Sequence, residues 1–229
     1  MSNPYFQFKQ FTVWHDKCAM KVGTDGVLLG AWTSVQGAHS ILDVGTGTGL
    51  VALMLAQRSL PNTNIVALEI DEAAAGQAKE NIVRSPWKKQ IEVVQADFRK
   101  YQSPEKFDVI VSNPPYFVDS LGCPDQQRNS ARHNDSLTYE ELLEGVTGLL
   151  TENGTFTIVI PMDVADRVKM IASEKKLQAV RQLNVITKPG GIPKRTLITF
   201  SFSNQECIVE ELLTEVARHQ YSKESVSYT

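Results

Sequence analysis

Cysteine, long apolar runs and charge of one sign are all scarce in this chain. Its 229 residues contain three cysteines, Cys18, Cys123 and Cys207, and their wide separation indicates neither a disulfide framework nor a zinc cluster. No stretch approaches the roughly 20 apolar residues of a membrane-spanning helix, and the N-terminus lacks the apolar segment of a secretory signal. We therefore expect a cytoplasmic protein without a metal site.

The charge balance excludes a protein that coats nucleic acid through bulk positive charge. The net charge is −3 and the pI is about 5.8, so a nucleic-acid partner would need a local basic patch. A content of 42% hydrophobic and 21% charged residues is typical of a globular protein. The length fits one domain, which we divide into an N-terminal segment, a core and a C-terminal part, at residues 1–39, 40–160 and 161–229.

From about residue 40, short β-branched apolar runs alternate with longer amphipathic stretches, which is typical of βαβ units. The strands are expected at 40–44, 64–70, 91–94, 107–112, 155–160, 179–186 and 196–203. The helices are expected at 50–58, 71–84, 139–150 and 164–176. The pattern predicts an α/β fold whose seven-stranded sheet is mostly parallel, with a C-terminal antiparallel strand and helices on both faces.

The N-terminal segment does not follow this alternation. A Gly-Thr-Asp-Gly turn at 23–26 precedes an apolar run, so Thr24 or Asp25 is expected to cap a short helix. The segment is either a flap that covers one edge of the sheet or a lid over a binding site, and the sequence favours neither.

A glycine-rich loop, Asp43-Val-Gly-Thr-Gly-Thr-Gly49, follows one strand and opens a helix. Its glycines let the backbone approach a ligand closely at the positive end of that helix. The spacing is GxGxG preceded by an acid, whereas dinucleotide sites carry GxGxxG, so the loop disfavours NAD. A tight turn without a ligand is the alternative interpretation.

Acidic residues also follow the next two strands. Glu69 ends the second strand, and Asp97 and Phe98 come just after the third. Ligands of open α/β sheets bind at the carboxyl ends of the strands, where these residues meet. We expect Glu69 to accept hydrogen bonds from ribose hydroxyls and Asp97 to accept one from an exocyclic adenine amine, beside the Phe98 ring. Each acid alone is nearly as consistent with a surface carboxylate, but together they favour a nucleoside site.

The tetrad Asn113-Pro114-Pro115-Tyr116 directly follows the fourth strand. Its prolines fix φ and leave carbonyls as rigid acceptors, and Asn113 adds a side-chain carbonyl. These acceptors can hold both hydrogens of a planar amine, which directs the nitrogen lone pair outward, while Tyr116 stacks on the ring. No general base is required if a sulfonium donates the methyl group, because in-line positioning then supplies the catalysis. A rigid turn is the alternative.

With these motifs the chain resembles the class I S-adenosylmethionine-dependent methyltransferases of the NPPY subgroup, which methylate planar amines. The stretches Phe8–Phe11, His15–Trp32 and Leu53–Arg58 are similar to the tRNA1(Val) (adenine(37)-N6)-methyltransferase family, and the resemblance covers about residues 5–205. It implies the Rossmann-like class I fold. It also implies methyl transfer from S-adenosylmethionine to N6 of adenine 37, in the anticodon loop of a valine tRNA.

The resemblance also implies roles for individual residues. The catalytic residues would be Asn113, Pro114, Pro115 and Tyr116. The cofactor-binding residues would be Lys21, Gly23, Thr24, Asp43, Gly45, Thr46, Gly47, Gly49, Glu69, Ile70, Asp97, Phe98 and Asn113.

Two basic regions are candidates for holding the RNA, because phosphate contacts from Lys and Arg give affinity that does not depend on sequence. Residues 175–205 contain no Asp or Glu, and a second cluster follows the tetrad. We expect tRNA contacts from Arg128, Arg132, His133, Lys194 and Arg195. Solvated charged surfaces are the alternative, and no obligate protein partner is expected.

Three other functions compete with this one. Glutamine N5-methyltransferases of release factors also use NPPY, although they usually carry a helical N-terminal substrate domain. Ribosomal RNA guanine-N2 methyltransferases often have Phe in the last position of the tetrad. A non-catalytic RNA-binding module with the same fold is disfavoured by the intact Asn113 and Tyr116.

Overall fold

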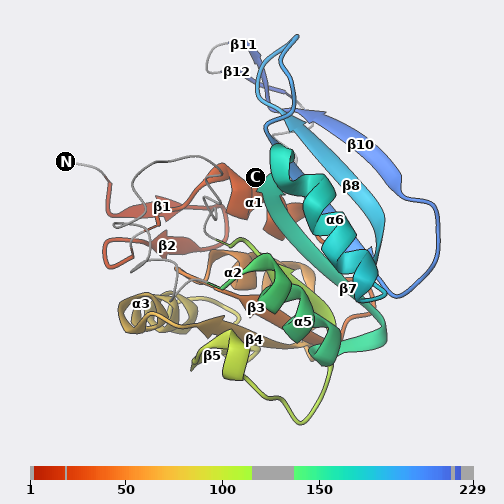
Figure 1. Ribbon diagram of the computed structural model, residues 1–229. Helices are drawn as coiled ribbons and strands as arrows, with labels where there is room; N and C mark the ends of the chain where they lie inside the picture. Colours follow the sequence, from red (N-terminus) through yellow and green to blue (C-terminus); the bar gives the residue numbers. More distant parts are fainter. Residues whose placement is uncertain (1–2, 19, 115–136, 218–219, 223–229) are drawn as a thin grey trace, which may run out of the picture.

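A computed structural model describes residues 3–18, 20–114, 137–217 and 220–222 (Figure 1). Its largest element is an eight-stranded sheet with the strand order β10-β8-β9-β7-β6-β3-β4-β5. Its strands are β3 (Ser40–Val44), β4 (Asn64–Glu69), β5 (Ile91–Gln95), β6 (Phe107–Ser112), β7 (Leu150–Pro161), β8 (Gln178–Ile186), β9 (Arg195–Ser201) and β10 (Ile208–Leu213).

The sheet is mostly parallel, as the sequence predicts. Strands β5, β4, β3, β6 and β7 are parallel neighbours, while β9 lies antiparallel between β7 and β8. The prediction of seven strands is wrong by one, because β10 pairs in parallel with the outer side of β8. Within β10 only Leu212 is buried, and Glu210 and Glu211 interrupt its apolar pattern. An edge strand of this kind gives little signal in the sequence.

Helices cover both faces of the sheet. They are α1 (Thr24–Trp32), α2 (Leu50–Arg58), α3 (Glu72–Val83), α5 (Tyr139–Leu149) and α6 (Ala165–Glu174), with short 3-10 helices η1 (Phe98–Lys100) and η2 (Met162–Val164). In β3, Ile41 packs into the apolar cluster under α1 and α2, whereas its neighbour Leu42 packs into the cluster under α5 and α6. This alternation is the period-two pattern of a strand buried on both faces.

The start of α1 differs from the prediction. Its N-cap is Gly23 rather than Thr24 or Asp25, and no side-chain hydrogen bond caps it. The Asp25 carboxylate instead accepts a hydrogen bond from Arg195 Nε of β9 at 3.3 Å. Helix α3 does have a side-chain cap, because Asp71, at the start of the range expected for this helix, accepts from Ala74 N at 2.8 Å.

The N-terminal residues form a hairpin outside the large sheet, in which β1 (Tyr5–Gln7) pairs with β2 (Thr12–Trp14). We call the described residues 3–18 and 20–23 the flap. The flap packs against α3 (Figure 1).

A second small hairpin, β11 (Glu215–Ala217) with β12 (Gln220–Tyr221), lies at the other end of the molecule. Among the described residues, no helix has the length and apolar character needed to span a membrane.

Candidate active site

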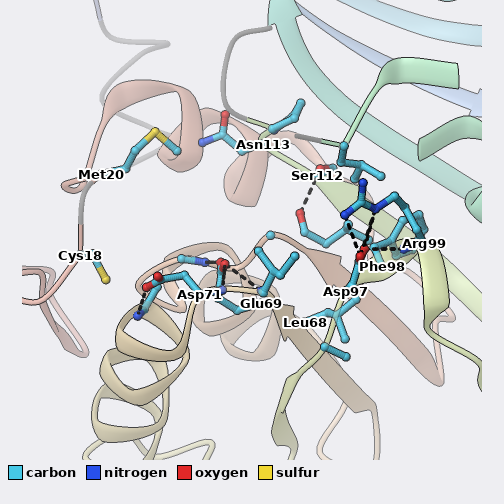
Figure 2. Close-up of a pocket in the computed structure, with 18 residues that line it drawn as sticks. Cys18, Met20, Leu68, Glu69, Asp71, Asp97, Phe98, Arg99, Ser112 and Asn113 are labelled. Carbon is cyan, nitrogen blue, oxygen red and sulfur yellow. Dashed lines mark hydrogen bonds and ion pairs between the residues drawn. The ribbon is translucent and has the colours of Figure 1, made fainter. Parts of the chain in front are cut away.

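A cavity of about 310 Å³ lies at the carboxyl ends of β3, β4, β5 and β6 (Figure 2). Its volume is at the lower end of the range for small-molecule sites. Eight residues expected from the sequence line it: Gly45, Gly47, Glu69, Ile70, Asp97, Phe98, Asn113 and Pro114. The chain therefore brings together the glycine loop, both strand-end acids and the start of the tetrad.

The glycine loop presents bare backbone to this cavity. Gly45 and Gly47 have φ values of +74° and +56°, which side chains rarely adopt, and a Cβ atom on either would meet nothing within 4 Å. Gly49 also has a positive φ, but its Cβ would lie 3.4 Å from the Cβ of Ala78 in α3. Gly45 and Gly47 thus leave room for a ligand, whereas Gly49 permits close packing of the loop on α3.

Glu69 holds the glycine loop through its carboxylate and is only 9% exposed. Its Oε2 accepts from Gly47 N at 2.8 Å, and its Oε1 accepts from the backbone N–H groups of Ile70 and Asp71 at 2.9 and 3.0 Å. A carboxylate has about four acceptor sites, so these bonds leave room for one further donor. Accepting two ribose hydroxyls would require the release of one backbone bond.

Asp43 lies behind the glycine loop and does not line the cavity. Its Oδ2 accepts from Thr46 Oγ1 at 2.6 Å and from Ala52 N at 3.1 Å, which ties the loop to the first turn of α2. Burial raises the pKa of Asp43 to about 7, because removal from water disfavours the charged carboxylate, and the nearby Glu69 carboxylate adds to this effect. Asp43, Thr46 and Gly49 therefore shape the loop from outside the cavity.

Asp97 forms an ion pair that the sequence analysis missed. Its carboxylate accepts from Arg99 Nη2 at 2.7 Å and from Arg99 Nε at 2.9 and 3.0 Å. These bonds lower the pKa of Asp97 below its usual value. Phe98 between them is buried, and its ring fits against Gly145 of α5, where a Cβ would lie only 2.5 Å from the ring. An adenine amine that binds Asp97, as the sequence predicts, would therefore share the carboxylate with Arg99 or replace it.

The start of the tetrad lies next to the glycine loop because β6 is in register with β3. Ser112 pairs with Val44, and its Oγ donates to the Val44 carbonyl at 2.9 Å, so Asn113 and Gly45 extend from neighbouring strand ends. Helix α1 approaches Asn113 at Gly26, where a Cβ would lie 3.7 Å from Asn113 Nδ2. The remaining predicted residues near the tetrad, Pro115, Tyr116, Arg128, Arg132 and His133, lie outside the described residues.

Several expected residues are described but do not line the cavity. Lys21 is exposed on the flap, and Gly23 and Thr24 begin α1. Lys194 is exposed beside β9, while Arg195 forms the ion pair with Asp25. Because Arg195 pairs in register with Pro161, both basic residues lie at the carboxyl end of β7, on the same edge of the sheet as Asn113.

The flap contributes residues to the cavity that sequence patterns did not single out. Cys18 and Met20 lie across the cavity from Asp97 and Arg99 (Figure 2). Burial raises the pKa of the Cys18 thiol to about 11, which keeps it protonated near neutral pH. Both lie in the stretch His15–Trp32, but the sequence assigned them no place in the site, and their position at the cavity follows from the packing of the flap on α3. Other lining residues that were missed include Leu68, Ala96, Arg99 and Leu137.

Comparisons with known proteins agree with this architecture. The methyltransferase small domain family matches residues 22–187. A predicted O-methyltransferase of Agrobacterium tumefaciens shares the fold, with a TM-score of 0.68 at 16% identity over 89% of this chain and 94% of that one. The sheet order and this likeness identify the fold as that of the class I methyltransferases.

Several relatives at higher identity carry the name tRNA1(Val) (adenine(37)-N6)-methyltransferase. The protein of that name from Bacteroides thetaiotaomicron is 82% identical over 98% of this chain and 94% of its own length. The one from Yersinia pestis is 42% identical over 96% of this chain and 89% of its own. The chain belongs to the methyltransferase small domain family and, within it, to the tRNA1(Val) (adenine(37)-N6)-methyltransferases.

Proposed function

We propose that this protein transfers a methyl group from S-adenosylmethionine to N6 of adenine 37 in tRNA1(Val). The observation that carries the proposal is the position of Asn113 and Pro114 at the cavity that the glycine loop and Glu69 also line, in a chain of this family. We infer that the protein acts in the cytoplasm, because its proposed substrate is a tRNA.

The residues around the cavity fit S-adenosylmethionine. The bare backbone at Gly45 and Gly47 leaves space for its amino-acid part, and Glu69 Oε2 retains acceptor capacity for a ribose hydroxyl. Asp97 and Phe98 offer an acceptor and a ring for the adenine at the other end of the cavity. When bound, the cofactor supplies an electrophilic methyl group on a sulfonium.

The substrate amine would be held by acceptors of the tetrad. The Asn113 side-chain carbonyl and the Pro114 main-chain carbonyl would each accept one N–H of the adenine amine, which directs the nitrogen lone pair toward the methyl group. Tyr116 would stack on the base. An anticodon-loop adenine suits such a site, since a loop base is extruded for a few kcal/mol at most, whereas a base within a duplex does not reach a pocket.

Basic residues at the same edge of the sheet would hold the tRNA backbone. Lys194 is exposed at this edge. Arg128, Arg132 and His133 lie outside the described residues, and we propose the same role for them from the sequence alone. Arg195 is assigned a more limited role, because its guanidinium already pairs with Asp25 of α1. Its contribution would come partly from orienting α1, which packs beside Asn113.

The proposal is tested by methyl transfer to total tRNA with labelled S-adenosylmethionine, followed by nucleoside mass spectrometry. The wild type is expected to yield N6-methyladenosine at position 37 of tRNA1(Val). Asn113→Ala should abolish turnover while the affinity for S-adenosylhomocysteine stays within a few-fold. Asn113→Asp keeps the side-chain acceptor and should retain partial turnover. A new methyl on guanine, on cytosine or on a release-factor glutamine, with tRNA1(Val) unmodified, would contradict the assignment.

A further inference from the structure

One face of helix α3 carries polar residues toward the flap. Glu80 and Asn81 lie three and four residues after Gln77, and the C-cap Arg84 lies four and three residues after them, which places the four residues in one stripe. Gln77 and Asn81 are each only 1% exposed. Buried amides are costly unless they are hydrogen-bonded, so their partners indicate what this stripe does.

The amide of Asn81 joins two separate parts of the chain. Its Oδ1 accepts from Trp14 N at 2.9 Å, and its Nδ2 donates to the Trp14 carbonyl at 2.8 Å. The amide therefore pairs with both main-chain polar groups of this flap residue. The same Nδ2 donates to the carbonyl of Thr48 in the glycine loop at 2.9 Å. The preceding residue, Gly47, is the one whose N–H donates to Glu69.

The other members of the stripe also contact the flap. Gln77 Oε1 accepts from Lys17 N at 3.1 Å, and Glu80 pairs with Lys17 Nζ at 2.6 Å. The Arg84 guanidinium lies over the Trp14 ring at 5.5 Å. Lys17 immediately precedes Cys18, which lines the cavity. The position of the flap wall of the cavity is thus fixed from α3, and Asn81 is the stripe residue that also reaches the glycine loop.

We propose that Asn81 is a positioning residue for cofactor binding, which holds the flap and the glycine loop in a fixed relation before the cofactor arrives. Two parts of the cavity wall that are already in place lose less conformational freedom on binding, so affinity rises without an added contact to the ligand. The proposal rests on the proposed function only for the identity of the ligand.

Four variants separate this role from simple support of the fold. Asn81→Leu removes all three bonds at similar volume, and Asn81→Asp keeps the acceptor for Trp14 N but cannot donate to either carbonyl. Gln77→Leu breaks only a flap bond, and Glu80→Ala breaks only an exposed ion pair. Calorimetry with S-adenosylhomocysteine, well below each melting temperature, gives the Kd, and initial rates give KM for S-adenosylmethionine and for tRNA.

The two Asn81 variants should raise the Kd and the cofactor KM by roughly ten- to a hundredfold, as expected for the loss of buried hydrogen bonds. Their kcat and tRNA KM should change by less than about threefold, since bonds to the substrate are intact. Gln77→Leu should raise the Kd by roughly two- to fivefold, and Glu80→Ala should leave it unchanged. A lowered melting temperature with an unchanged Kd, or equal effects of Gln77→Leu and Asn81→Asp, would overturn the proposal.

The wild type alone supplies a further test if the Asn81 variants do not fold. Hydrogen exchange should find the Trp14 and Lys17 amides protected in the ligand-free protein, because their acceptors are buried amides. Rapid exchange of both amides until S-adenosylhomocysteine is added would show that the flap docks only after binding, and would overturn the proposal. Failure of the wild type to bind S-adenosylhomocysteine at all would contradict the proposed function instead.

Discussion

The two ends of the cavity hold their carboxylates in different ways. At the glycine-loop end, Glu69 lines the cavity and Asp43 lies behind the loop; both are buried, and both accept backbone N–H groups. At the opposite end, the side chains of Asp97 and Arg99 are 18% and 27% exposed, and most of their bonds join side chain to side chain. The carboxylates at the glycine-loop end are held by main-chain N–H groups, whereas the Asp97 carboxylate is held by an ion pair near the surface.

This difference also appears in the titration of the two aspartates. Burial raises the pKa of Asp43 to about 7, while hydrogen bonds from Arg99 lower the pKa of Asp97. Ion pairs at the surface contribute little to stability, about 0–1 kcal/mol. Removing one partner of a buried hydrogen bond costs about 1–3 kcal/mol. The glycine-loop end should therefore be the sensitive one, and the Asp97 end should tolerate an exchange of partners when a ligand binds.

Glu69→Ala should have the largest effect at the glycine-loop end. It removes the acceptor for three backbone N–H groups and the proposed ribose contact. A hydrogen bond to a charged group is worth about 1.5–3 kcal/mol, so affinity for S-adenosylhomocysteine should fall at least tenfold in calorimetric titrations. Glu72→Ala, which removes an exposed carboxylate three residues later, is the matched control and should bind normally. Equal affinity of Glu69→Ala and the wild type would remove Glu69 from the site.

Gly47→Ala tests whether the bare backbone of the loop matters for the ligand or only for the turn. Gly47 and Gly37 both have positive φ, and a Cβ on either meets nothing within 4 Å. Alanine should therefore destabilise both sites through the same backbone strain, about 1–2 kcal/mol. Of the two, only Gly47 lines the cavity, so only its variant should also lose affinity for S-adenosylhomocysteine. An equal loss in Gly37→Ala would show that stability, not contact, controls binding.

The strand ends at the cavity were predictable from the sequence, because β3, β4 and β6 are largely buried on both faces and their sequences are nearly continuous apolar runs. The glycine loop and Glu69 follow those runs directly. The ion pair of Asp97 with Arg99 was missed because an exposed arginine is not part of any apolar periodicity in the sequence. The only available sign was its position two residues after an acid at a strand end. Cys18 and Met20 were missed for another reason, since their place at the cavity depends on the docking of the flap onto α3.

Asp43→Asn should change how the free energy of unfolding depends on pH, and it should change the free energy of unfolding in acid much less. The pKa of Asp43 is raised on folding, so the folded state keeps this proton while the unfolded carboxyl ionises. The free energy of unfolding should therefore decrease as pH rises from about 4, the pKa of an unfolded aspartate, to about 7. The asparagine side chain of the variant does not titrate, and urea unfolding across this window should show a shallower slope in the variant. Identical slopes would mean that Asp43 stays ionised in the folded protein.

Arg99→Ala should have the smallest effect, and it tests the Asp97 end. Because both side chains are partly exposed, the free energy of unfolding should change by less than about 1 kcal/mol at neutral pH. A carboxyl whose pKa is lowered on folding stabilises the protein above its unfolded pKa, and this stability is lost as pH falls. The wild type and Arg99→Ala should therefore converge in stability in acid.

The same variant tests whether Asp97 exchanges Arg99 for the cofactor amine when the ligand binds. If it does, Arg99→Ala should bind S-adenosylhomocysteine within a few-fold of the wild type. Asp97→Ala should lose about tenfold in affinity, as expected for one hydrogen bond to a charged group. Equal losses in the two variants would show that the pair acts as a unit, and the contrast between the two ends of the cavity would then not hold.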